Sequence, residues 1–403
     1  MANVSSSNGL EKRPKLRFPG FDVPYKQCRI GDIYAERSLR GASDMELLSV
    51  TMNDGVKPRS EIEGKDNSSE DKSNYKIVRK GDMVYNSMRM WQGANGISPC
   101  DGIVSPAYTV LMPKQEINNG YFAALFKSAN LINEFRKNSQ GMTSDTWNLK
   151  YPQIETIKVQ IPSVSEQDKV SELFGVVDAR IVAQAQLIEA LKKYKRGLVS
   201  QILKQRLAIS HEDDEWKEVC LSDVAEGFEY GLNAAATAYD GKHKYIRITD
   251  IDDDTHAYIN QDPVSPSGAF EERYRVREND ILFARTGASV GKSYLYCKND
   301  GDLFFAGFLI RIHVKEGVDG EYVFLNTLTE EYDKWVLLES ARSGQPGINA
   351  EQYRKYRFKL PSLNTQRRIA TIARNIDVQI QKEALHLRLL QKQKAGLLQQ
   401  LFI

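Results

Sequence analysis

The feature that most constrains this chain is an internal repeat with a period of about 199 residues, half of its length of 403. Four blocks of similar sequence return in the same order. The paired blocks are Tyr25–Ile33 with Trp216–Val224, Val78–Tyr85 with Val276–Phe283, Ile161–Gln167 with Leu360–Gln366, and Val177–Asp178 with Ile376–Asp377. Because order and spacing are both kept, the sequence predicts two copies of one structural unit.

Each copy begins with a segment that alternates short β-type runs with Gly, Asp and Asn turns. Asp280–Ala284 and Lys355–Leu360 have the composition of strands, whereas Gly120–Lys137 and Gly320–Ser340 are predicted to be helices. The segment is therefore predicted to be an α+β globular domain. The first domain is expected over 1–162 and the second over 208–361.

Each copy ends in a long helix, expected over 163–207 and 362–403. Pro162 and Pro361 close the preceding strands, and Ser165 and Thr365 are expected to cap the helix starts. Apolar residues then recur with alternating spacings of four and three, the pattern of a coiled coil. The expected helix-packing residues are Val177, Ile181, Ile188, Leu191, Leu198 and Ile202 in the first helix, and Ile376, Ile380, Leu387, Leu390, Leu397 and Leu401 in the second.

Each of these residues in the second helix lies 199 positions after its counterpart in the first, so the two helices are expected to pack on one another. Two copies related by a pseudo-two-fold axis would place the helices antiparallel. The predicted fold class is therefore α+β, with two tandem domains, an internal pseudo-two-fold repeat, and two long helices that form an antiparallel coiled coil.

The net charge of +2 hides a strong asymmetry. Residues 1–164 carry a net +4, residues 165–206 carry +3, residues 207–363 carry −10, and residues 364–403 carry +5. The four cysteines lie far apart, which is typical of reduced thiols rather than of a disulfide framework. The sequence shows no apolar segment of membrane-spanning length and no signal-peptide core, so we expect a cytoplasmic protein.

No catalytic or metal-binding constellation stands out. The segment Arg285–Ser293 resembles a phosphate-binding loop, but Thr286 stands where the first glycine belongs, and a strand rather than a helix is expected to follow. The acidic run Asp250–Asp254 lacks the glycine and distal glutamate of a calcium loop, and is expected to be a solvated turn. We therefore predict neither an enzyme active site nor a bound metal in this chain.

What remains is a set of loops that combine basic, amide and hydroxyl side chains with aromatic ones. Bidentate Arg, Asn and Gln side chains read base edges, whereas Lys and Ser/Thr mostly hold phosphates. The candidate DNA-binding residues are Lys57, Arg59, Ser87, Arg89, Gln92, Thr143 and Ser144 in the first copy, and Arg247, Arg285, Thr286, Lys292, Arg342 and Gln345 in the second.

With its duplicated layout, the chain resembles the specificity subunits of type I restriction-modification enzymes, the HsdS family. The resemblance covers nearly the whole chain. It rests on the two helix starts at Ile161–Gln167 and Leu360–Ala370, on Lys15–Phe21 near the front, and on Ser343–Asn349 in the second copy.

The resemblance implies two target-recognition domains, each reading one half of a bipartite sequence on double-stranded DNA, and two conserved helices that help to set the spacer. It implies a non-catalytic subunit that holds two methyltransferase (modification) subunits, which restriction or motor subunits can join. S-adenosylmethionine, Mg and ATP are expected only on those partners, and this chain is expected to bind no cofactor and no membrane.

The two copies differ in the loop before the last strand, where the first has Gly141–Trp147 instead of the Gly-Gln-Pro-Gly-Ile-Asn form. The two domains are therefore expected to read different half-sites. The charge of −10 on residues 207–363 leaves one alternative open, a coiled-coil adaptor whose β-rich domains bind proteins rather than DNA, because phosphate contacts need positive charge.

Overall fold

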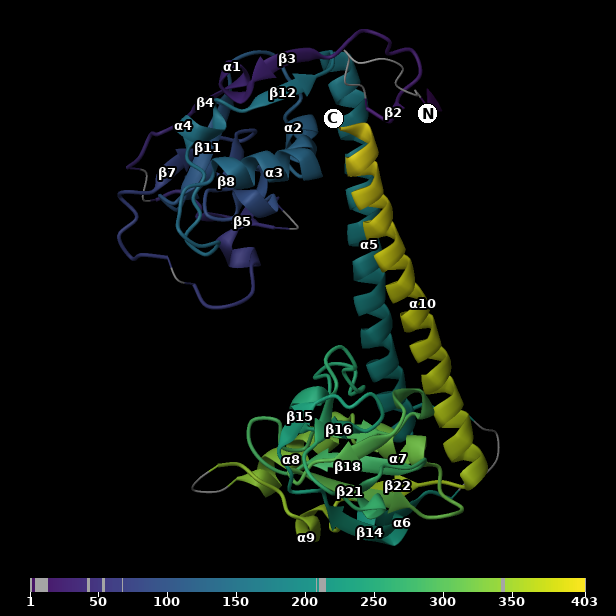
Figure 1. Ribbon diagram of the computed structural model, residues 1–403. Helices are drawn as coiled ribbons and strands as arrows, with labels where there is room; N and C mark the ends of the chain where they lie inside the picture. Colours follow the sequence, from purple (N-terminus) through teal and green to yellow (C-terminus); the bar gives the residue numbers. More distant parts are fainter. Residues whose placement is uncertain are drawn as a thin grey trace. The chain divides into compact units, whose positions relative to one another are not determined.

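The computed structural model describes residues 2–3, 14–41, 44–52, 55–66, 68–207, 209, 215–341 and 345–402. The chain divides into two compact units, a first unit of Met1–Ala185 with Leu385–Ile403 and a second unit of Gln186–Ala384. Each unit contains one α+β domain and part of each of the two long helices, α5 (Val164–Leu203) and α10 (Leu363–Leu401) (Figure 1). The predicted fold class, with two domains and two long helices, is confirmed.

The first domain is built from short strands and short helices. Its elements are β1 (Ala2–Asn3), β2 (Leu16–Arg17), β3 (Lys26–Arg29), α1 (Ile30–Ile33), β4 (Tyr34–Glu36), β5 (Leu48–Thr51), β6 (Gly55–Pro58), η1 (Arg59–Glu61), β7 (Lys76–Val78), β8 (Met83–Asn86), η2 (Met90–Gln92), β9 (Asn95–Ile97), β10 (Gly102–Val104), β11 (Tyr108–Pro113), α2 (Asn119–Leu125), α3 (Ala129–Asn138), α4 (Tyr151–Ile154) and β12 (Lys158–Ile161).

The second domain repeats much of this order. Its elements are β13 (Lys217–Cys220), α6 (Leu221–Val224), β14 (Ala225–Tyr230), β15 (Ala236–Ala238), β16 (Lys244–Ile246), η3 (Ile248–Asp250), β17 (Val264–Pro266), η4 (Glu272–Tyr274), β18 (Asp280–Ala284), β19 (Ser293–Leu295), η5 (Lys298–Asp300), β20 (Leu303–Phe305), β21 (Leu309–Val314), α7 (Gly320–Asn326), α8 (Glu330–Ser340), α9 (Ala350–Tyr353) and β22 (Arg357–Leu360).

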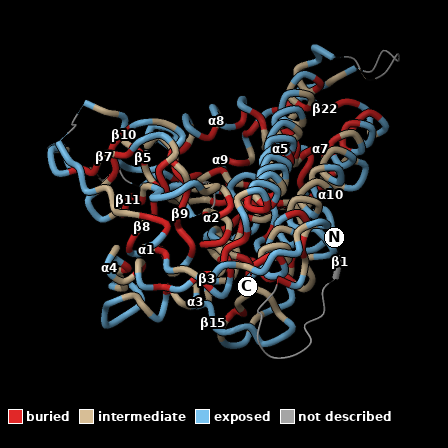
Figure 2. The backbone as a smooth tube through the Cα atoms, turned by 90° about the horizontal axis from the view of Figure 1, so that it is seen from above, coloured by how far each residue is buried: buried red, intermediate tan, exposed pale blue. Residues whose placement is uncertain are grey.

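The largest sheet of each domain has the same plan. The order is β4-β11-β8-β9 in the first domain and β14-β21-β18-β19 in the second, and every pairing is antiparallel. The central strands β8 and β18 come from one pair of repeated blocks, and β18 is buried along its whole length. Figure 2 shows buried segments within the domains, whereas the long helices are mostly exposed or half-buried.

Each of the two predicted mid-domain helices is broken into two, so the prediction of single helices over Gly120–Lys137 and Gly320–Ser340 is wrong. The breaks fall at equivalent places, after α2 and after α7. The Ser128 hydroxyl accepts a hydrogen bond from the Leu131 N–H (3.4 Å), and the Thr329 hydroxyl accepts one from the Tyr332 N–H (3.2 Å). These side chains cap a new helix, α3 or α8, and so interrupt the longer one.

The repeated Pro…Gln block joins each long helix to the domain that precedes it. Gln167 donates from Nε2 to the Pro162 carbonyl (3.0 Å) and accepts at Oε1 from the Asn118 N–H (3.0 Å). Gln366 makes the same two bonds, to the Pro361 carbonyl (2.8 Å) and from the Asp319 N–H (2.9 Å). Both glutamines are buried, so each one satisfies backbone groups that water does not reach.

The long helices begin at Val164 and Leu363, within one residue of the predicted starts at 163 and 362 but before the predicted caps. The Thr365 N–H donates to the Ser362 hydroxyl (3.4 Å), so Ser362 rather than Thr365 occupies the capping position of α10. Helix α5 begins at Val164, and the Glu166 N–H donates to the Ser163 carbonyl, which leaves Ser165 inside the first turn. The predicted caps at Ser165 and Thr365 are therefore wrong, because the serine that directly follows each proline is closer to the first free N–H groups.

The two long helices run antiparallel within each unit. In the first unit, Lys394 pairs with Asp178 (2.5 Å) and Phe402 lies beside Phe174. In the second unit, Lys195 pairs with Asp377 (2.5 Å). Of the twelve expected packing residues, Ile188, Ile202, Leu390 and Leu401 are buried and the other eight are half-buried.

The last turns of each long helix complete the core of a domain. In the first unit, the Phe402 ring stacks on Phe174 (5.8 Å between centroids) and meets Tyr121 edge-on (5.3 Å). In the second unit, Val199 and Ile202 belong to the core that contains the buried strands of the second domain. Each domain is thus supported by the start of one long helix and by the end of the other.

Candidate nucleic-acid interface

Loops from distant parts of the second domain meet at one edge of its largest sheet. Strand β14 ends at Tyr230 and β18 ends at Ala284, and their partners on β21 are Ile310 and Leu309, at the start of that strand. The chain segments that follow β14 and β18 and precede β21 therefore leave the sheet together. We call residues 230–233, 285–291, 306–308 and 345–348 the second loop edge.

Backbone hydrogen bonds hold this edge together. The Arg285 N–H donates to the Phe308 carbonyl (3.1 Å), and the Ile348 N–H donates to the Arg285 carbonyl (2.9 Å). The Ala350 N–H donates to the Tyr230 hydroxyl (3.2 Å). The backbone of Arg285 is therefore held by two segments that are far apart in the sequence, those of Phe308 and Ile348.

The Arg285 side chain lies over the Tyr230 ring, with 5.0 Å between the guanidinium carbon and the ring centroid. Its Nε atom is buried without a hydrogen-bond partner, and none of the described residues offers this guanidinium a carboxylate. Next to it, Phe308 leaves 61% of its surface exposed. Stacking on Tyr230 restricts the position of the Arg285 guanidinium, but the described residues accept no hydrogen bond from its N–H groups.

Two further predicted residues lie on the same edge. Thr286 pairs as an isolated β-bridge with Gly347, and the Gly287 N–H donates to the Pro346 carbonyl (3.1 Å). Gly287 has a φ of +81°, and a Cβ there would lie 3.3 Å from Gln345 Nε2. The structure thus brings Arg285, Thr286 and the exposed Gln345 together, whereas Arg342 lies outside the described residues.

Arg247 and Lys292 are engaged inside the second domain. Arg247 makes two hydrogen bonds to Asp250 (2.8 and 2.7 Å), which raise the pKa of its guanidinium. Lys292 donates to the Ile251 carbonyl (3.0 Å) and pairs with Asp253. Both cations stabilise the acidic turn Asp250–Asp254, so they are less available to an external ligand than Arg285.

The first domain has an equivalent loop edge. Strand β8 ends at Asn86 opposite Tyr108, the start of β11. The Leu149 N–H donates to the Ser87 carbonyl (2.9 Å), the counterpart of the bond from Ile348 to Arg285. We call residues 86–94, 105–108 and 141–149 the first loop edge. Ser87 occupies the place of Arg285, but it is buried and its hydroxyl lies 3.0 Å from that of Thr109.

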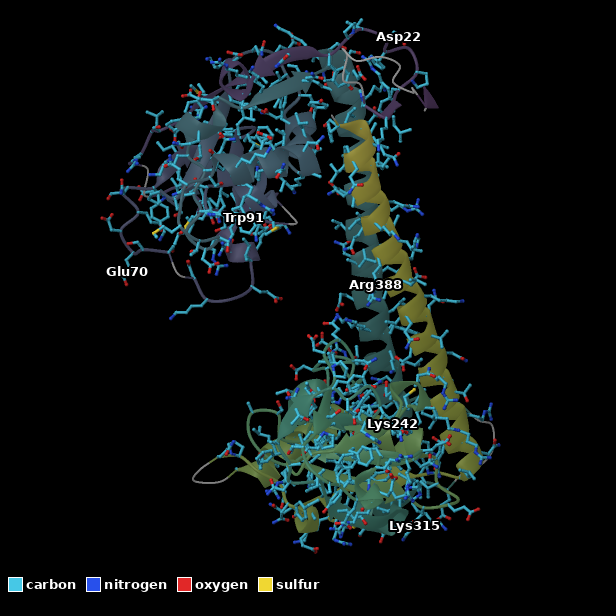
Figure 3. The ribbon with its side chains drawn as sticks, in the orientation of Figure 1. Asp22, Glu70, Trp91, Lys242, Lys315 and Arg388 are labelled. Atoms are coloured by element: carbon cyan, nitrogen blue, oxygen red, sulfur yellow. The ribbon has the colours of Figure 1, made fainter. Side chains whose placement is uncertain are left out.

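Aromatic side chains dominate the first loop edge. Trp91, labelled in Figure 3, meets Trp147 edge-on (5.2 Å between centroids), and its indole N–H donates to the Met88 carbonyl (3.1 Å). The guanidinium of Arg136, in the last turn of α3, lies 5.7 Å from the Trp91 centroid. Sequence reasoning missed Arg136, Tyr230 and Phe308. An exposed aromatic residue beside a basic loop is the pattern that could have indicated them.

The remaining predicted residues of the first domain divide into two groups. Arg89 is half-buried and Gln92 is exposed in the Trp91 loop, and Thr143 and Ser144 are exposed in the loop that contains Trp147. Lys57 on β6 is half-buried and already makes an interaction, so it is not free. Arg59 donates to the carbonyls of Ile62, Gly64 and Lys65. Its side chain therefore stabilises the loop that follows it and is less available to an external ligand.

Two segments of the chain, 28–193 and 213–388, match the family model of the type I restriction modification DNA specificity domain. The chain belongs to this family. The two specificity domains coincide with the two halves of the internal repeat, and each match extends into a long helix.

Curated relatives agree with this family. The chain is 25% identical to the type I restriction enzyme StySPI specificity subunit of Salmonella potsdam over 284 residues, which are 66% of this chain and 59% of that protein. It is 22% identical to the type I restriction enzyme MjaVIII specificity subunit of Methanocaldococcus jannaschii over 321 residues, 75% of this chain and 73% of that protein. The chain therefore matches only about three fifths of the length of the Salmonella subunit.

Solved structures show the same fold. The S subunit of a type I restriction-modification system from M. genitalium has a TM-score of 0.54 at 15% identity, over 97% of this chain and 99% of that chain. A chain from work on complex assembly and conformational transition of the type I R-M system has a TM-score of 0.60 at 14% identity, over 95% and 98%. The architecture of the specificity domains is thereby confirmed.

The segment Arg285–Ser293 joins β18 to β19, two antiparallel strands, so no helix N-terminus follows it to hold a phosphate. The described ranges contain no group of three or more His, Cys, Asp or Glu side chains placed to hold a metal ion. Among the same ranges, no helix has an apolar stretch of the length that spans a membrane.

Proposed function

We propose that this chain is the non-catalytic DNA-sequence specificity subunit of a type I restriction-modification complex. Each domain reads one half of a bipartite target on double-stranded DNA. One observation carries this proposal: the two loop edges have the same backbone framework but different side chains. Leu149 and Ile348 make the same bond to the preceding loop, which presents Ser87 in one domain and Arg285 in the other. Two domains with the same backbone framework but different side chains at the loop edge are suited to recognise two different half-sites.

The proposed partners are two methyltransferase subunits, through which restriction or motor subunits join the complex. Both long helices keep large apolar side chains exposed. They are Val176, Val182, Leu187 and Tyr194 on α5, and Val378, Leu385 and Leu389 on α10. Each long helix is already packed against the other along one side. Apolar side chains that remain exposed on its other sides are therefore evidence for a binding surface for another protein. S-adenosylmethionine, Mg and ATP belong to those partners in this proposal.

The long helices are also proposed to set the spacer between the half-sites. Helix α5 has 40 residues and α10 has 39, and each is unbroken. At 1.5 Å per residue a helix of this length extends about 60 Å, the length of some 18 base pairs of B-DNA. A paired helix of fixed length is stiff enough to act as a ruler.

The acidic character of the second domain fits a subunit that works with partners. Many of its arginines are neutralised by carboxylates, as in the pairs Arg311–Glu229 and Arg357–Glu218. In the proposed complex the methyltransferase subunits supply much of the positive charge that faces the phosphates, whereas this domain supplies selected base contacts.

A domain exchange tests the proposed function. Residues 1–162 are replaced by the equivalent domain of another such subunit, and the complex is assembled with its methyltransferase subunits. The methylated sequence is then read across a DNA library. We expect one half of the target to change and the other half to persist.

The reciprocal exchange of residues 208–361 is the matched control, and it should change only the other half. If both halves change in either chimera, the modular assignment is wrong. If the intact complex methylates DNA without regard to sequence, the chain is instead the protein-binding adaptor.

A further inference from the structure

Seven arginines in the described residues lie over aromatic rings. Five of them also pair with a carboxylate, which explains their position as part of the fold. These five are Arg17, Arg273, Arg275, Arg311 and Arg354. The other two are Arg136, which lies on α3 beside the first loop edge and over its Trp91, and Arg285, which belongs to the second loop edge.

The isolation of Arg285 is notable in a domain that carries an excess of acidic groups. Arg275, on the same domain, pairs with Glu272 and Asp302, and Arg311 pairs with Glu229 and Asp280. Within the described ranges the Arg285 side chain lies over the ring of Tyr230 and pairs with no carboxylate, and its Nε atom is buried without an acceptor. The residue as a whole is half-buried, so an acceptor from outside the protein would bind the terminal N–H groups of the guanidinium, which none of the described residues uses.

Arg136 is held in a comparable way from a different element. It is exposed in the last turn of α3 and lies over Trp91, which is itself fixed by Trp147 and by the Met88 carbonyl. The adjacent Lys137 pairs with Glu134, whereas the described residues offer Arg136 no carboxylate. The ring restricts where the guanidinium can lie without using its five N–H donors.

We infer that Arg136 and Arg285 are the specificity-determining arginines of this chain, one for each half-site, and that each reads the edge of a guanine. This inference rests on the proposed function. The O6 and N7 atoms of guanine accept two parallel N–H bonds from one guanidinium, and a stacked arginine binds with less loss of side-chain freedom. Because the two arginines lie on different elements, the guanines occupy different positions within the two half-sites.

The test measures methylation of a randomised bipartite DNA library by the complete complex of this chain with its methyltransferase subunits. The variants are Arg285→Ala, Arg285→Lys, Arg136→Ala and Arg136→Lys. For Arg285 we expect the preference for guanine at one position of the second domain's half-site to fall by roughly 5- to 150-fold. Arg136 variants should do the same in the other half-site only.

The lysine variants separate base reading from phosphate binding. Lysine keeps the charge but not the bidentate fork, so it should lose the guanine preference as alanine does. If lysine restores the wild-type pattern, or if alanine weakens methylation equally for all sequences, the arginine binds a phosphate and the inference is wrong. The lysine variant also decides the question where the alanine variant fails to assemble.

Two exposed arginines that pair with carboxylates serve as matched controls. Arg357→Ala in the second domain removes a partner of Glu218, and Arg79→Ala in the first removes a partner of Asp101. Both controls should keep the wild-type sequence preference. If the Arg136 and Arg285 variants keep the wild-type preference, the inference is wrong but the proposed function stands. If the wild-type complex itself shows no sequence preference, the proposed function is wrong.

Discussion

Lys195 of α5 forms an ion pair with Asp377 of α10, with 2.5 Å between Nζ and Oδ2. The residues related to them by the repeat, Lys394 and Asp178, form the same pair in the first unit. Both lysines stand where the apolar pattern of their helix is interrupted. These polar positions specify which residues face each other, because a shift by one helical turn would separate both lysines from their carboxylates.

We predict that reversing the charge of one partner destabilises the helix pair and that reversing both largely restores it. Lys195→Glu or Asp377→Lys should each lower the free energy of unfolding by about 1 kcal/mol, since like charges then face each other across a partly exposed site. Urea unfolding of the two single variants and of the double variant measures the coupling. Effects that simply add would show that the pair does not specify the alignment.

The buried glutamines at the helix starts should be costly to replace. Gln366→Leu leaves the Pro361 carbonyl and the Asp319 N–H without their partner, and we expect the free energy of unfolding to fall by about 2–4 kcal/mol. Gln391→Leu, at an exposed position of α10, is the matched control and should change stability little. Thermal unfolding of both variants distinguishes them. An equally small effect of both substitutions would refute the structural role of Gln366.

The spacer proposal predicts a change of length without a change of sequence. One heptad is inserted into each long helix, after Leu191 and after Leu390, so that the apolar pattern is kept. The added seven residues lengthen each helix by about 10 Å, and the gap between the methylated half-sites should grow by about three base pairs. Sequencing of methylated DNA reads the gap directly. An unchanged gap with intact half-sites would exclude the ruler.

Stability should depend on the protonation of His256. Burial lowers the pKa of this side chain, and its Nδ1 lies 2.8 Å from the Ser293 carbonyl. As the pH falls below about 6.5, the unfolded chain binds a proton that the folded chain excludes, so stability decreases by up to about 1.4 kcal/mol per pH unit. We expect His256→Asn to weaken this dependence between pH 7 and 5.

Asparagine suits this position because His256 has a positive φ of 56°, which asparagine tolerates. Urea unfolding at several pH values compares the two proteins, and the other histidines contribute equally to both. Identical pH profiles would show that His256 titrates alike in the folded and unfolded states.

The features of the fold that can be predicted from the sequence are those that repeat or that are periodic along the chain. The offset of 199 residues revealed the duplication, and the four-three spacing revealed α5 and α10, because both patterns persist over tens of residues. The interruptions at Ser128 and Thr329 were missed, because a single capping hydroxyl ended each helix within a sequence that otherwise favours helix.

The site was harder to predict than the fold, because its contacts join distant segments. Arg285 meets Tyr230 from 55 positions away, and no local pattern indicates that pair. Arg247 looked like an accessible arginine, but a carboxylate three residues along binds it. Ser87 looked like a loop hydroxyl, but it points into the domain toward Thr109. Only the structure shows which polar side chains already make hydrogen bonds or ion pairs within the protein.

The packing of Phe402 against Phe174 and Tyr121 has a consequence for the order of folding. The first domain leaves the ribosome early, yet the aromatic side chain that closes its core is synthesised after the whole second domain. Until then Tyr121 and Phe174 lack the Phe402 ring, and the nascent first domain carries an unfinished apolar surface. The domain that is translated first is therefore the one that is completed last.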